Sequence, residues 1–318
     1  MSRLDFEKPI YELESKINEL KNFDSKKSVD LSPEVKKLQN KLEKMKMDVY
    51  QKLSPWQRIQ IARHPDRPYT LDYIKMIAQD FVELHGDRLF ADDYAMISGF
   101  ATVADQKVLI IGHQKGRDIK ENVMRNFGCA HPEGYRKAMR LMKLAEKFNL
   151  PVLIFIDTPG AYPGIGAEER GQAQAIATNL MEMAQISVPI VAIVIGEGGS
   201  GGALGIGVAD KVLILQHAYY SVISPEGCAS ILWRNSVRAP DAAKALKIMG
   251  EDLLEFGMVE AVIEEPLGGA HRDPEAVAEK IKTHAIEYIK ALKKLSKKEL
   301  LDERYQRFRK IGRFTEEK

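Results

Sequence analysis

The sequence predicts an α/β fold on three observations. Short apolar runs typical of strands alternate with stretches whose apolar residues recur every three to four positions, as on one face of a helix. Three of the runs end in a glycine-rich turn, which indicates a repeated unit of strand, turn and helix. The chain has 318 residues, 45% of them hydrophobic, which is enough for one large domain with an appendage.

Two helices are expected first along the chain. Apolar residues step by three and four along residues 9–20 and again along residues 35–49, the spacing of two helices that pack together. We therefore predict an antiparallel helical hairpin over residues 1–55, whose lysines form a solvated face. The remainder, residues 56–318, is predicted to be one domain with a C-terminal helical tail.

The elements of this domain follow a proline-rich link at residues 63–70. Thr70 is expected to cap a helix that runs to about Leu84, and from Ala95 the pattern changes to strands. Strands are predicted at residues 96–103, 107–112, 152–157, 190–196 and 211–215. Helices are predicted at residues 134–148, 168–185 and 201–208. From Asp273 onward, lysine-rich amphipathic helices are expected to pack on the core or on a partner.

Composition narrows the classes of function. The formal net charge is +2 and acidic and basic residues interleave, so binding to nucleic acid is not expected. The two cysteines, Cys129 and Cys228, form no C-x-x-C pair, which argues against a disulfide framework or a zinc finger. No run approaches the roughly 18 apolar residues of a membrane span and no leader opens the chain. The simplest prediction is a soluble cytoplasmic protein.

The most unusual segment, residues 194–207, has seven glycines among fourteen residues. Gly196, Gly198 and Gly201 match the G-x-G-x-x-G template of a dinucleotide site. Such a site needs an acidic residue about 20 positions later to hold the ribose, and residues 217–220 contain none. Dinucleotide binding is therefore not the favoured interpretation.

A second template fits the same segment. Gly198, Ser200 and Gly202 match the G-x-S-x-G of a serine hydrolase, in which Ser200 would be the nucleophile. None of the seven histidines lies in a recognisable catalytic phrase. Because geometry rather than sequence identifies a catalytic triad, a serine hydrolase of the Clp protease type using Ser200 remains an alternative.

A third interpretation uses the backbone alone. Glycines at the start of a helix leave N–H groups unpaired and let a ligand approach them, which is the chemistry of an oxyanion hole. The turn at residues 157–166 suits a matching role, because two prolines stiffen it and three glycines permit tight geometry.

In the turn at residues 157–166, Tyr162 is expected either to stack on a flat ring or to pack the loop on the core. Asp157 is expected to anchor loop amides. Lys115 or Arg117 either holds an anionic group or forms a charged surface turn.

These segments together resemble one family. The chain is similar to the alpha subunit of the bacterial acetyl-CoA carboxylase carboxyltransferase. The resemblance lies in eight phrases, in order from Ala62 to Arg272: ARHPDRPYTLDY, IIGHQKGR, PEGYRKA, FIDTPGAYPG, GAEERGQ, IGEGGSGGAL, YSVISPEGCASILW and PLGGAHR. Eight long phrases in register are far more specific than one glycine motif.

The resemblance implies a crotonase-like (ClpP/crotonase) superhelix of ββα turns and a carboxyl transfer from carboxybiotin to acetyl-CoA, giving malonyl-CoA for fatty acid synthesis. It implies a beta subunit as partner, in an α2β2 assembly with the active site between the chains, together with a biotin carboxyl carrier protein and a biotin carboxylase. Biotin would then sit on the carrier, the acceptor would be a coenzyme A thioester, ATP would be used by another subunit, and zinc would bind only in the beta subunit. A non-catalytic assembly subunit is the remaining alternative.

The resemblance also assigns site residues. The family provides two amide pairs for two oxyanions, and the alpha pair maps to Gly201 and Gly202, with the biotin ureido oxygen as the favoured target. The residues expected to bind substrate or biotin around this pair are Gly160, Ala161, Tyr162, Gly164, Gly198, Gly199 and Ser200.

Overall fold

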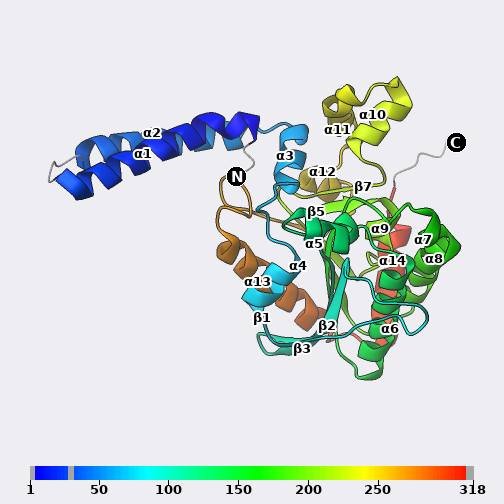
Figure 1. The fold of residues 1–318 in the computed structure, drawn as a ribbon. Coiled ribbons are helices and arrows are strands. Elements are labelled where there is room, and N and C mark those ends of the chain that lie inside the picture. The colour runs from blue at the N-terminus through cyan, green and yellow to red at the C-terminus, as the bar shows by residue number, and fades with distance from the viewer. Residues whose placement is uncertain (1–3, 28–31, 313–318) are drawn as a thin grey trace, which may run out of the picture.

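An eight-stranded mixed sheet forms the centre of the protein in a computed structural model, which describes residues 4–27 and 32–312 (Figure 1). The strands are β1 (Ala78–Glu83), β2 (Met96–Val103), β3 (Gln106–His113), β4 (Val152–Thr158), β5 (Ile190–Gly199), β6 (Lys211–Leu215), β7 (Tyr219–Ser221) and β8 (Ala261–Ile263). Their order is β1-β2-β3-β4-β5-β6-β8, and β7 pairs with the end of β5. The pairs among β1, β2 and β3 are antiparallel and all the other pairs are parallel.

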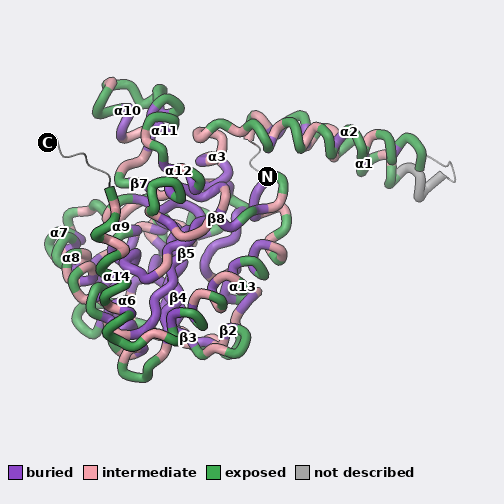
Figure 2. Tube along the Cα trace, turned by 180° about the vertical axis from the view of Figure 1, so that it is seen from behind, coloured by how far each residue is buried: buried purple, intermediate pink, exposed green. Residues whose placement is uncertain are grey.

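Helices cover both faces of the sheet. Figure 1 places α6, α8 and α14 on one side and α4 and α13 on the other. The helices are α1 (Lys8–Lys27), α2 (Ser32–Tyr50), α3 (Pro55–Ala62), α4 (Thr70–Ile77), α5 (Ile119–Met124), α6 (Pro132–Lys147), α7 (Ile165–Glu169), α8 (Gln172–Met183), α9 (Ser200–Leu204), α10 (Pro225–Trp233), α11 (Ala239–Leu246), α12 (Gly250–Glu255), α13 (Pro274–Leu292) and α14 (Lys297–Arg309). Because both faces are covered, β4 and β5 are buried along their whole length (Figure 2). The α/β prediction is confirmed.

The segment after Thr70 differs from its prediction. The helix expected to reach Leu84 ends at Ile77, and β1 follows it and pairs antiparallel with β2. No glycine or proline marks the change, and the ladder with β2 supplies the hydrogen bonds that a longer helix would have made. Asp80, with φ of +53°, lies where the register of the pairing shifts.

Two further helices are shorter than predicted. The helix expected at residues 168–185 is split into α7 and α8 by Gly171, whose φ of +81° is left-handed. The helix expected at residues 201–208 is α9, which ends at Leu204, before a segment with two further glycines. In both cases glycine, which interrupts a helix readily, determines the boundary.

The hairpin helices α1 and α2 form an arm that extends from the body (Figures 1 and 2). Ile10, Ile17, Val35 and Leu42 are buried in the seam between them, and the residues that join them, 28–31, lie outside the described chain. The structure thus contains the two helices expected within residues 1–55. The division at that point into hairpin and domain stays a prediction.

The C-terminal helices pack on the core. Ile281, Ala285 and Ile289 of α13 and Leu300 of α14 belong to the main hydrophobic cluster. Within residues 4–27 and 32–312, no helix combines the length and apolar character that crossing a membrane requires.

Candidate active site

The two glycine turns after β4 and β5 contact each other through their backbones. Thr158 pairs with Gly198 across these parallel strands. A Cβ atom on Gly199 would lie 2.2 Å from the carbonyl oxygen of Pro159, and one on Gly202 would lie 2.4 Å from the carbonyl carbon of Gly160. Only glycine permits this approach. The structure therefore brings together three of the predicted site residues, Gly160 and, across from it, Gly199 and Gly202.

Helix α9 begins immediately after β5 and presents its first turn beside this contact. No side chain caps its N-terminus, so the first-turn amides of Gly201 and Gly202 have no intrahelical acceptor and no side-chain acceptor at the cap. Gly202 is buried and Gly201 is half-buried, with space around it: a Cβ on Gly201 would find its nearest neighbour, Ile176 Cδ1, at 3.7 Å. Such a turn can stabilise an oxyanion.

Gly198, Tyr162 and Gly164 have other surroundings. A Cβ on Gly198 would lie 2.8 Å from the ring of Tyr220, so this glycine allows β5 to pack on β7. Tyr162 lies against the His131 ring with centroids 4.1 Å apart, and a Cβ on Gly164 would lie 2.4 Å from the Tyr162 ring. Tyr162 therefore packs on His131 and on its own loop, and its stacking on a flat ring stays a prediction. Ala161 lies next to Tyr162 and takes part in the contact with Gly202. A Cβ on Gly202 would lie 2.6 Å from the Ala161 nitrogen.

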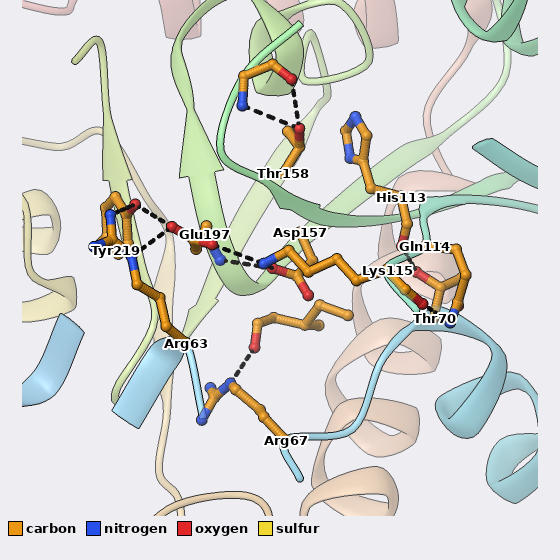
Figure 3. A network of polar contacts seen from close by, with 12 residues as sticks. Arg63, Arg67, Thr70, His113, Gln114, Lys115, Asp157, Thr158, Glu197 and Tyr219 are labelled. Atoms are coloured by element: carbon orange, nitrogen blue, oxygen red, sulfur yellow. Dashed lines mark hydrogen bonds and ion pairs between the residues drawn. The ribbon is translucent and has the colours of Figure 1, made fainter. Parts of the chain in front are cut away.

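A charged network lies beneath the two turns (Figure 3). Lys115 Nζ lies 2.7 Å from Asp157 Oδ1 and 2.8 Å from Glu197 Oε1. Glu197 Oε2 accepts hydrogen bonds from Arg63 Nε at 2.7 Å and from the Tyr219 hydroxyl at 2.6 Å. Burial alone would raise the pKa of Glu197, but Lys115 and Arg63 lower it to about 2. For Lys115, the two carboxylates outweigh burial and raise the pKa above its ordinary range.

Lys115 and Arg117 are both paired inside the chain. Lys115 contacts the two carboxylates of the network, where an anionic ligand had been one expectation. Arg117 pairs with Asp72, donates to the Pro65 carbonyl at 2.6 Å and lies over the Tyr69 ring at 3.9 Å. Neither cation therefore needs a ligand to balance its charge.

Asp157 anchors an amide, but not in its own loop. Its Oδ1 accepts the Glu197 N–H at 2.9 Å, across the pair of strands. A Cβ on Gly196 would lie 2.4 Å from the same oxygen, so the carboxylate sits directly against the β5 backbone.

The histidines give no support to a hydrolase. Ser200 is exposed at a φ of +50°, and its hydroxyl has no hydrogen bond to a histidine in the part of the chain that the structure describes. His113, at the end of β3, is fully buried, and burial followed by the charge of Lys115 lowers its pKa to about 3. A Ser-His pair does not form around Ser200.

Sequence reasoning missed the arginines that hold this region together. Arg63 joins the network described above, and Arg67 donates to Ile195 O at 2.7 Å and forms two hydrogen bonds, of 2.8 and 2.7 Å, with Glu265. Both arginines come from the proline-rich link at residues 63–70, for which the sequence alone predicted no role. One signal was available for Glu197: an acidic residue among the glycines directly after a buried apolar run.

The Arg67–Glu265 pair is expected to contribute to the free energy of unfolding, and this contribution should be lost in acid. Burial alone would raise the pKa of Glu265, but Arg67 lowers it from 4.5 to about 2. Since the folded pKa is depressed, the stabilisation is complete above about pH 4.5 and is lost as the pH falls toward 2. In Glu265→Gln, the slope of unfolding free energy against pH in that window should decrease by up to about 1.4 kcal/mol per pH unit, measured by urea unfolding. The exposed neighbour Glu264→Gln is the control, and an unchanged slope in Glu265→Gln would contradict the assignment.

Metal-binding chemistry is not visible in the described ranges. There, no group of three histidine, cysteine or carboxylate residues lies close enough to hold a metal ion, and Cys129 and Cys228 are free.

Comparisons with known proteins identify the family of the chain. The family model described as acetyl co-enzyme A carboxylase carboxyltransferase-like matches residues 3–312. The chain is 55% identical over 314 residues to the acetyl-coenzyme A carboxylase carboxyl transferase subunit alpha of Geobacter metallireducens, covering 99% of this chain and 98% of the relative. It is 54% identical to the subunit of the same name from Thermus thermophilus, covering 98% of this chain and 99% of the relative.

Solved structures resemble the chain at lower identity. Transcarboxylase 12S aligns with a TM-score of 0.54 and 21% identity, over 70% of this chain and 44% of that one. A Pseudomonas malonate decarboxylase heterodimer, MdcD–MdcE, aligns with a TM-score of 0.54 and 15% identity, over 63% of this chain and 82% of that one. At such identities the likeness concerns the fold alone, and it confirms the crotonase-like prediction.

Proposed function

Because this chain belongs to the family of acetyl-CoA carboxylase carboxyltransferase alpha subunits, we propose that its two glycine turns form the alpha half of the carboxyltransferase site. The family's reaction moves a carboxyl group from carboxybiotin to acetyl-CoA and yields malonyl-CoA, the first committed step of fatty acid synthesis. The observation that carries the proposal is the open first turn of α9, held by backbone contact against the turn after β4.

The residues present fit a biotin ureido group. When bound, that group supplies the carboxyl group for transfer and a nitrogen that accepts a proton. Gly201 and Gly202 would donate their N–H groups to the ureido oxygen as it gains negative charge, and each well-placed donor lowers such a barrier by about 3 kcal/mol. Space beside Gly201 gives the ligand access, and the peptide dipoles of α9 add positive potential.

The other site residues support this pair. Gly199 and Gly202 allow the turns to touch, because a Cβ on either would collide with the backbone of residues 158–161, and Ala161 lies directly against Gly202. Ser200, in its left-handed conformation, turns the chain from β5 into α9 and so orients the amides that follow. The family's reaction needs no general base from this chain, because its proton acceptor is the biotin nitrogen itself.

This chain works in a hetero-oligomeric complex, as the designation of its relatives as subunit alpha indicates. We assign its partners as a beta subunit in an α2β2 assembly, a biotin carboxyl carrier protein and a biotin carboxylase, in the cytoplasm. The beta subunit would supply the second amide pair, for the thioester oxyanion, and the zinc site. As the family resemblance implies, ATP would be consumed by the biotin carboxylase, and no G-x-x-x-x-G-K-[ST] phosphate loop is then expected in this sequence.

We expect malonyl-CoA decarboxylation, the reverse reaction with a biotin derivative as acceptor, only when this chain is combined with its beta subunit. The chain alone should be inactive, because half of the oxyanion stabilisation is missing. The assay compares the chain alone with the co-expressed pair, whose assembly is checked by size-exclusion chromatography. A well-assembled but inactive pair would contradict the proposal, and an active pair that tolerates every glycine change would favour an assembly subunit instead.

A further inference from the structure

Lys115 is buried where nothing in the proposed chemistry needs a lysine. It leaves the sheet two residues after His113, and its side chain is only 12% exposed. The stem is enclosed as well as the ammonium: a Cβ on Gly128 would lie 2.8 Å from Lys115 Cγ. Burying an ammonium group is costly unless its partners compensate it, so its two carboxylate partners explain its position.

Those partners lie at the ends of the two strands that carry the glycine turns. Asp157 is in β4, three residues before Gly160, and Glu197 is in β5, four residues before Gly201. Their carboxylates share one ammonium group, at 2.7 and 2.8 Å. Lys115, which follows β3, thus links the ends of β4 and β5, where the two glycine turns begin (Figure 3).

Lys115 supplies one of the two positive charges that face three carboxylates in the network. Arg63 contacts Glu197 but also lies 2.5 Å from Glu226, so one guanidinium group serves two carboxylates. Asp157 has Lys115 as its only ion-pair partner among the described residues. Without the lysine, Asp157 and Glu197 would repel each other in a buried setting and would add negative potential beneath amides that must stabilise an anion.

We propose that Lys115 is a positioning residue, which holds Asp157 and Glu197 together and thereby sets the separation of the two glycine turns. The inference rests on the proposed function for its effect on rate. Lys115 itself contacts no reacting atom in this scheme, since its ammonium group is occupied by the two carboxylates.

The test uses the co-expressed complex and three variants. In Lys115→Met, kcat for malonyl-CoA decarboxylation should fall about 100-fold while KM stays within about threefold, because misplaced amides weaken transition-state binding. Lys115→Met/Asp157→Asn should be more active than Lys115→Met, because the neutral amide removes the repulsion and its oxygen still accepts the Glu197 N–H. Lys290→Met is the control, since Lys290 pairs with Asp105 at the opposite end of β3, where both are exposed.

Amide hydrogen exchange measures whether the two turns are held in place, and it does not depend on an activity assay. Residues 158–161 and 197–203 should exchange faster in Lys115→Met than in Lys290→Met. Equal exchange, or a double variant no more active than the single one, would overturn the inference, because a lysine that merely fills space is replaced well by methionine. An inactive wild-type complex would count against the proposed function instead, and the exchange comparison would still decide the role of Lys115.

Discussion

Gly202→Ala is expected to lower the rate of carboxyl transfer by about 100- to 1,000-fold, the loss typical of removing one oxyanion-hole donor. The new methyl group would lie 2.4 Å from the carbonyl carbon of Gly160 and 2.6 Å from the nitrogen of Ala161. Both are backbone atoms, so one turn must shift by about 1 Å, enough to misplace the donors. The change keeps the N–H group of residue 202 and acts by altering the distance between the turns.

Gly201→Ala gives the matched comparison. Its methyl group would meet nothing closer than 3.7 Å, and the N–H group remains, so its loss of rate should be at least tenfold smaller than that of Gly202→Ala. Gly201→Trp should block the reaction by filling the space in front of the amides. The measurement is kcat and KM of malonyl-CoA decarboxylation by each complex, with urea unfolding as the check on folding. Equal rates for the two alanine variants would remove the basis for placing the site at this contact.

Much of the fold follows from local pattern, and the site follows from it only in part. The apolar runs of β4 and β5 identify two buried parallel strands, whose carboxyl ends meet at one edge of a sheet. The sequence therefore brings the turns at residues 157–166 and 194–207 to the same region. It does not show that they touch at Gly160 and Gly202, since that contact depends on where α9 starts relative to β4.

The roles of the charged residues were harder to predict than the strands, because each charged residue pairs with a partner that is distant in sequence. Lys115 is 42 residues from Asp157 and 82 from Glu197, and Arg63 is 134 from Glu197. Taken singly, Lys115 looks like a free cation in a glycine turn. Only the parallel order of the strands brings its partners to it. The segment of β1 was misassigned for a related reason, because its conformation depends on a neighbouring strand rather than on its own residues.

Arg304 shows the same limit in the C-terminal helices, whose sequence gave no sign of a buried cation. Its side chain is 1% exposed. Nε and Nη2 each donate to Asp210 at 2.8 Å, and Nη1 donates to the carbonyls of Met183 and Ile186 at 2.7 Å. Nη2 also donates to Val188 O at 3.1 Å. One guanidinium group thus joins α14 to the end of α8, to the loop before β5 and to the residue before β6.

Arg304→Met is therefore expected to lower the free energy of unfolding by about 3–5 kcal/mol, the cost of leaving one member of a buried ion pair without its partner. Asp210 would keep only the Ile190 N–H, and the loop carbonyls would lose their donor. Urea unfolding of this variant, with the exposed Arg309→Met as control, measures the loss, and a value below about 1 kcal/mol would show that water replaces the guanidinium contacts. The contact with Ile190 lies at the start of β5, and the glycine turn follows Gly199 at its other end. The fraction of Arg304→Met that remains folded should therefore keep its carboxyltransferase rate. Arg304→Met would then lose stability but keep its rate, whereas Gly202→Ala, just beyond the other end of β5, would lose rate. Together the two variants would show that the start of β5 serves stability and its end serves the reaction.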